Sequence, residues 1–149
     1  MSEDPMDRFQ HFQIKPQLLE HGKTINRLVN TDIISCSVQV IASGGETNLH
    51  AHKGNDAIWL VLQGAANFYT TEQRLVARLE KYEGLLIPRE VPYWFESAAD
   101  ENLVILRLGA YAQNEPGGRI DFEPAKFVTS AEGSFYADTR AKDGAVFGG

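Results

Sequence analysis

The sequence predicts an all-β domain, a small barrel or sandwich, from three observations. Short segments with strand-like patterns follow one another, separated by turn residues at close intervals. Residues 34–43, ISCSVQVIAS, alternate polar and apolar side chains, which is the period of a strand with one buried face. No segment sustains the period of an amphipathic helix.

The expected strands can be placed in order along the chain. Residues 1–23 read as a polar N-terminal arm, residues 24–112 as the core, and residues 113–149 as an extension that packs on the barrel or on a partner subunit. Gly44 and Gly45 provide a turn, and residues 71–74, TEQR, loosely fit a hairpin turn. The expected core strands are residues 25–30, 34–43, 57–64, 65–71, 75–83, 84–88, 93–97 and 101–112.

Size and composition bound the class of protein. The 149 residues suit one domain, and 43% hydrophobic with 23% charged residues is close to the globular average, which argues against disorder. No apolar run is long enough to cross a bilayer and the N-terminus lacks a signal-peptide layout, so we expect a cytoplasmic protein. The single cysteine, Cys36, excludes an intramolecular disulfide.

The net charge of -6 limits the partners that we expect. Nucleic acid or an anionic membrane would require a basic face, and the sequence has no cluster of Lys and Arg. A small-molecule ligand is therefore the expected partner.

His50 and His52 are the strongest chemical signal. Two residues apart on an extended backbone, their side chains project from the same face with Cα atoms about 6.5 to 7 Å apart. One metal ion can accept both imidazoles, leaving positions open for other ligands or substrate.

The stretch around these histidines resembles the first motif of the cupin family. Gly44, then five residues, His50-x-His52, and a strand closing at Gly64 match that motif. Residues 82–97, YEGLLIPREVPYWFES, echo the second motif. The resemblance implies a cupin-type jelly-roll β-barrel, usually a homodimer, in which residues 57, 59 and 61 line the barrel.

The departures from the family motifs concern the metal ligands. The family's glutamate falls on Ala57, which cannot bind metal, and Asp56 lies one residue earlier, where a bulge could turn it inward. Tyr93 stands at the position of the third histidine. The candidate ligands are therefore His50, His52, Tyr93 and Asp56.

Tyr93 has three interpretations. As a ligand its phenol must be deprotonated, which suits ferric iron, so iron is the favoured metal, with manganese, zinc, nickel or copper as alternatives. A protonated hydroxyl could instead serve in substrate binding or acid/base catalysis. It could also be a residue of the barrel wall with no chemical role.

Aromatic and amide side chains complete the expected site. Trp59 and Phe95 are expected in the barrel, where they would also suit a flat substrate, and Gln39 and Arg107 are candidate polar lining residues. Two functions fit this pattern: a metal-dependent dioxygenase, isomerase or lyase acting on a small organic molecule, or a non-catalytic ligand-binding or sensor barrel.

Overall fold

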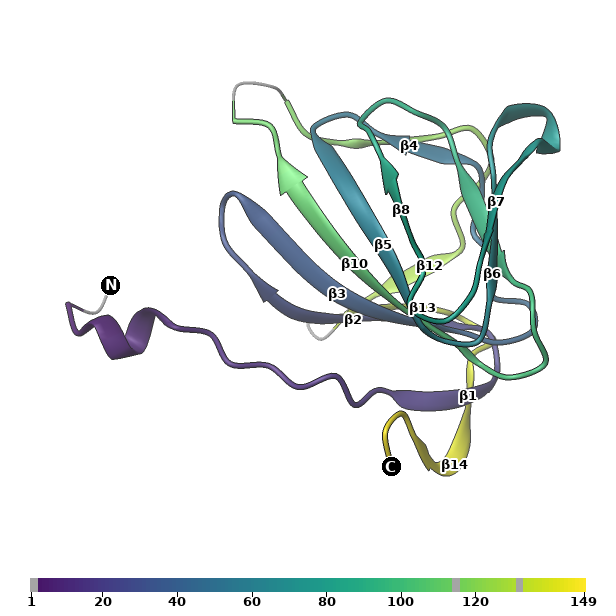
Figure 1. The fold of residues 1–149 in the computed structure, drawn as a ribbon, viewed down its shortest axis with the longest axis horizontal. Coiled ribbons are helices and arrows are strands. Elements are labelled where there is room, and N and C mark those ends of the chain that lie inside the picture. The colour runs from purple at the N-terminus through teal and green to yellow at the C-terminus, as the bar shows by residue number, and fades with distance from the viewer. Residues whose placement is uncertain (1–2, 114–115, 131–132) are drawn as a thin grey trace.

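The chain forms a β-barrel of two facing sheets in a computed structural model that describes residues 3–113, 116–130 and 133–149. Figure 1 shows the strands of the larger sheet fanned opposite β6 and β7. The larger sheet has the order β12 (Phe127–Thr129), β13 (Gly133–Tyr136), β2 (Lys23–Asn30), β3 (Ile34–Ile41), β10 (Leu103–Tyr111), β5 (Asn55–Gln63) and β8 (Gly84–Ile87). The smaller has β7 (Leu75–Leu79), β6 (Ala66–Tyr69) and β9 (Trp94–Ser97).

Four further strands lie outside these two sheets. β4 (His50–His52) pairs with β11 (Arg119–Asp121), and β1 (Gln17–His21) pairs with β14 (Arg140–Val146). The helical elements of the described chain are the 3-10 turns η1 (Pro5–Arg8) and η2 (Thr71–Gln73). None of the helices described is long and apolar enough to span a membrane. The predicted all-β fold is confirmed.

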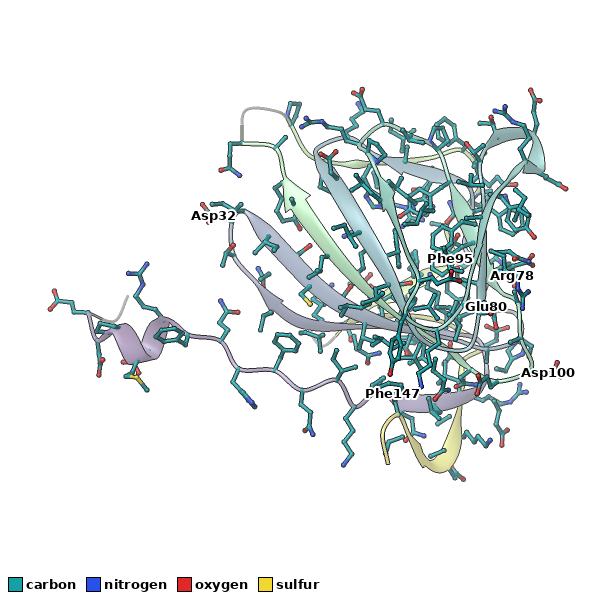
Figure 2. All side chains as sticks on the ribbon, viewed as in Figure 1. Asp32, Arg78, Glu80, Phe95, Asp100 and Phe147 are labelled. Carbon is teal, nitrogen blue, oxygen red and sulfur yellow. The ribbon has the colours of Figure 1, made fainter. Side chains whose placement is uncertain are left out.

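The core lies between the two sheets. Ile41, Trp59, Val61, Phe68 and Phe95 are among its buried side chains. Figure 2 places Phe95 among the side chains that fill this space. Burying such aromatic and branched side chains supplies most of the driving force for folding.

The apolar run of β5 is fully buried on its inner face and only partly covered on its outer face. Ala57, Trp59 and Val61 are 4%, 2% and 0% exposed, which confirms their predicted inward face. Ile58 on the other face is 48% exposed, although an almost wholly apolar strand such as residues 57–64 is typical of one that is covered on both faces. A continuous apolar sequence does not distinguish a fully buried strand from a barrel strand whose outer face stays open.

Both predicted turns form, with different residues in the left-handed backbone conformation. Gly44 has a positive φ of 75°, and a Cβ added there would lie 2.6 Å from the His21 ring. The hairpin at residues 71–74 instead places Glu72 and Gln73 at φ values of 59° and 55°, which non-glycine residues seldom adopt.

The C-terminal extension contributes strands to the barrel. Its β11 pairs with the histidine strand and its β13 with β2, while β14 pairs with β1 beneath the barrel (Figure 1). Residues 1–2 of the expected arm, and residues 114–115 and 131–132 of the expected extension, lie outside the described residues. The expected homodimer stays a prediction.

Candidate functional site

A cavity of about 150 Å³ lies inside the barrel at the level of the histidine strand. Side chains from both sheets and from β4 and β11 reach it, because inward positions alternate along each strand. It is lined by Lys23, Ile25, Ser37, Gln39, Thr47, His50, His52, Trp59, Tyr93, Phe95, Arg107, Arg119 and Phe127.

Backbone pairing on both sides fixes the position of His50. The His50 N–H donates to the Tyr93 carbonyl over 3.1 Å, and the Tyr93 N–H donates to the His50 carbonyl over 2.9 Å. On the other side, β11 places Asp121 opposite His50 and Arg119 opposite His52. Directly opposed residues of antiparallel strands share a face, so His50, Tyr93 and Asp121 are held as neighbours.

The two histidines are neutral at pH 7. Nδ1 of His50 lies 2.7 Å from the Asn48 carbonyl, which can only accept, so Nδ1 carries the proton and Nε2 has a free lone pair. Burial, followed by the charge of Arg119, lowers the pKa of His50 to about 3. Burial, followed by the charge of Arg107, lowers the pKa of His52 to about 4. The ring centroids are 5.2 Å apart.

Three buried polar atoms at the cavity have no hydrogen-bond partner among the described residues. They are the Tyr93 hydroxyl, the Trp59 indole Nε1 and the Gln39 Oε1. Burial raises the pKa of Tyr93, and the nearby Arg107 and Arg119 charges oppose that rise. Each unpaired group costs roughly 1 to 3 kcal/mol, so a bound molecule that supplied partners would be stabilised by them.

Lys23 is buried at the cavity with 1% of its surface exposed. Its Nζ lies 4.9 Å from the centroid of the Phe95 ring and 5.4 Å and 5.9 Å from those of Phe127 and Tyr136. Such rings attract a cation, but burial, followed by the charge of Arg119, lowers the pKa of Lys23 well below its usual value.

The two arginines differ in their partners. Arg119 donates from Nε to Asp121 Oδ1 over 2.7 Å and from Nη2 to Asn48 Oδ1 over 2.6 Å. Arg107 donates from Nη2 to the neutral amide of Asn55 over 2.7 Å, and its guanidinium carbon lies 5.7 Å from the centre of the Trp59 ring. In the described part of the chain, neither Arg107 nor Lys23 has a carboxylate partner.

Comparison with known proteins identifies the fold. No protein-family model and no curated protein matches the sequence. An uncharacterized conserved protein from Klebsiella pneumoniae with a double-stranded beta-helix domain is 15% identical, with a TM-score of 0.56 over 66% of this chain and 84% of its own. The Cnp3 cupin domain of Schizosaccharomyces pombe is 18% identical, with a TM-score of 0.55 over 60% of this chain and 64% of its own. The chain has the cupin fold.

One similar cupin-fold structure has a named activity. The DMSP lyase DddQ from Ruegeria pomeroyi is 16% identical, with a TM-score of 0.54 over 65% of this chain and 51% of its own. At these identities the likeness to solved structures shows the fold alone, and it confirms the predicted cupin-type jelly roll.

The cupin barrel brings most of the predicted site residues together. Those that line the cavity are His50, His52, Tyr93, Trp59, Phe95, Gln39 and Arg107. Asp56 does not join them: its Oδ1 accepts from the Arg89 backbone N–H over 2.8 Å. The register of β5 with β10 runs without a shift from Asn55 through Ala57, so there is no bulge between them that would turn Asp56 inward. Asp56 therefore points away from the face that Ala57 shares with Trp59.

These residues do not fit the metal ion that the cupin resemblance implies. Nowhere among residues 3–113, 116–130 and 133–149 do three His, Cys, Asp or Glu side chains meet as a metal-binding group. Two neutral imidazoles would have to hold a cation beside Lys23, Arg107 and Arg119, while no carboxylate of the described residues lines the cavity. Like charges at this range repel, and a buried phenol with a raised pKa is a poor anionic ligand.

Sequence reasoning missed Lys23 and Arg119. Lys23 falls in the expected arm, one residue before the expected core of residues 24–112, although Lys23 and Ile25 share the inward parity of β2. Arg119 lies in the polar extension, and only the pairing of β11 with β4 brings it to the histidines. The alternation of side chains along β2 could have placed Lys23 in the barrel, whereas no local sequence pattern indicates the pairing of β11 with β4.

Proposed function

We propose that this cupin barrel binds a small organic molecule in its central cavity. The observation that carries the proposal is the set of buried, unpartnered polar atoms on Tyr93, Trp59 and Gln39 between aromatic walls. Apolar cavities with a few convergent polar groups are typical of ligand sites. A cavity of about 150 Å³ accepts a molecule of roughly the size of benzene.

Ligand-observed NMR on chelator-treated protein tests this proposal. A set of one-ring and smaller compounds, neutral and charged, should contain binders of the wild-type chain. Ser37→Leu, which adds volume at the cavity wall, should abolish their binding. Thr129→Leu, at an exposed position of β12, should leave it unchanged. Equal binding to the wild type and to Ser37→Leu would place the ligands elsewhere and overturn the proposal.

A metal-dependent dioxygenase, isomerase or lyase is the second candidate. The observation in its favour is the contact from His50 Nδ1 to the Asn48 carbonyl, because metal-binding histidines commonly orient their free nitrogen in this way. Iron is favoured by the phenol of Tyr93, with manganese, zinc, nickel or copper as alternatives. The surrounding cations argue against it.

Metal content separates the two candidates. Elemental mass spectrometry should be applied to protein purified without chelators or an affinity tag, beside a His50→Ala, His52→Ala double variant. Near-stoichiometric metal that is lost in the double variant would favour the second candidate. Substoichiometric metal that the variant leaves unchanged, together with ligand binding after chelation, is the result that we expect.

A further inference from the structure

We infer that the cavity selects small organic carboxylates, with Arg107 as the principal contact for the carboxylate. This inference rests on the proposed function, because it names the class of molecule that the same cavity binds. It follows from the charge around the cavity, from the hydrogen-bond donors left free there, and from the apolar character of the remaining wall.

The charge around the cavity has one sign. Lys23, Arg107 and Arg119 all line it, and of the described carboxylates none does. Asp121 lies just outside and pairs with Arg119, and burial lowers the pKa of Lys23. Arg107 is thus the charge at the cavity that no described carboxylate compensates. The cavity therefore has a surplus of positive charge at Arg107, which an anion would balance. The protein as a whole is acidic, with a net charge of -6, so this surplus is local.

Hydrogen-bond donors are available to receive the anion. Arg107 donates from Nη2 to Asn55, and its guanidinium also lies close enough to the Tyr93 hydroxyl to act on the Tyr93 pKa, although that hydroxyl is left without a hydrogen bond. A guanidinium presents its N–H groups as a planar fork that matches the two oxygens of a carboxylate. The Tyr93 hydroxyl and the Trp59 indole N–H, 3% and 2% exposed by residue, are unpartnered donors on the same cavity.

The rest of the wall suits an organic body. Trp59, Phe95, Phe127 and Ile25 line the cavity beside the charged groups. Inorganic phosphate would leave these apolar surfaces without contact, whereas a carboxylate on a small ring would fill about 150 Å³ and meet both kinds of wall. The recognised molecule therefore has one carboxylate and a compact, apolar remainder.

Isothermal titration calorimetry with matched pairs tests the inference on the chelator-treated full chain at low ionic strength. The pairs are acetate with acetamide and benzoate with benzamide, which differ mainly in charge, and inorganic phosphate is the third kind of probe. We expect benzoate to bind at least tenfold more tightly than benzamide, and more tightly than acetate or phosphate. Arg107→Met should weaken benzoate at least tenfold. Arg89→Met, at the outer surface, should leave its affinity unchanged.

Each outcome separates the inference from the proposed function. If the amides bind as tightly as the carboxylates, the cavity is a neutral ligand site: the proposed function stands and the carboxylate inference fails. If phosphate is preferred, the organic part of the inference is wrong. If no probe binds and the NMR screen also finds no ligand, both fail. Should Arg107→Met not fold by circular dichroism, the comparison of each carboxylate with its amide in the wild type decides alone.

Discussion

The two walls of the cavity differ in their sequence origin and in their charge. His50, His52 and Tyr93 come from the two stretches that resemble cupin motifs, and the histidines are neutral at pH 7. Lys23, Arg107 and Arg119 come from β2, β10 and β11, outside those stretches. The two arginines supply the positive charge, whereas burial lowers the pKa of Lys23. The motif wall suggests a metal ion, and the cationic wall argues for an anion.

The difference shows that the ion or molecule a site binds depends on the charges around the site as well as on its donor atoms. The same two imidazoles would favour a cation beside a glutamate and a third histidine. Here the arginines that line the cavity help to lower the pKa values of both histidines, and no described carboxylate lines it. The class of ligand that we propose therefore depends on Lys23, Arg107 and Arg119, which lie outside the motifs.

The largest expected effect is acid destabilisation through the motif wall. Because the pKa values of His50 and His52 are about 3 and 4 in the folded chain and about 6.5 when unfolded, the unfolded chain takes up protons first as the pH falls below 6.5. Between pH 7 and pH 5, each histidine should lower the free energy of unfolding by about 2 kcal/mol. Urea unfolding of chelator-treated protein at both values measures this loss.

Variants assign that loss to the two histidines. His50→Gln with His52→Gln should remove about 4 kcal/mol of the pH dependence. His11→Gln, at an exposed histidine in the N-terminal arm, should keep the wild-type dependence. An unchanged slope in the double variant would mean that the pKa values of the two imidazoles are not lowered in the folded chain.

A smaller effect of opposite sign is expected for Lys23. Its amine is buried without a carboxylate partner among the described residues, so burial lowers its pKa, and three aromatic rings offset only part of the cost of removing it from water. Lys23→Met should therefore raise the free energy of unfolding by about 1 to 2 kcal/mol while weakening benzoate binding. Urea unfolding at pH 7 measures the gain.

Lys126→Met is the matched control for Lys23. The side chain of Lys126 is 49% exposed and pairs with Glu46, so its loss should change stability by less than about 0.5 kcal/mol. If Lys23→Met destabilised the chain instead, the contacts of the Lys23 amine within the protein would outweigh its desolvation cost. A bound anion would then not be needed to stabilise Lys23.

Much of the fold and half of the site follow from local sequence patterns. The period of two in β3 and the glycine turn predict strands because side-chain direction and backbone freedom are local properties. The positions of His50, His52 and Tyr93 follow from the motif resemblance. The prediction that Asp56 joins the site was wrong, because a shift of one residue in register moves a side chain to the other face of a strand. No local pattern in the sequence indicates that register.

The cationic wall could not be predicted in the same way. Arg119 reaches the cavity because residues 119–121 pair with residues 50–52, far away in the sequence, and a single sequence does not record such a pairing. Lys23 has the parity of an inward residue, but a lysine at a strand end is usually solvated, so its burial beside Phe95 depends on the closed barrel.

The smallest expected effect concerns Asp121, the one described carboxylate that pairs with the cationic wall. Asp121 accepts from Arg119 Nε and from Asn48 Nδ2, but the Asp121 and Arg119 side chains are 35% and 27% exposed, so solvent weakens the pair. Asp121→Asn should lower the free energy of unfolding by about 0.5 to 1 kcal/mol in 0.05 M NaCl at pH 7, and by less in 1 M NaCl. Asp100→Asn, in an exposed turn, should have no measurable effect. A stabilising Asp121→Asn would show that Arg119 needs no counter-charge, and it would contradict the positive field on which the binding of an anion in this cavity depends.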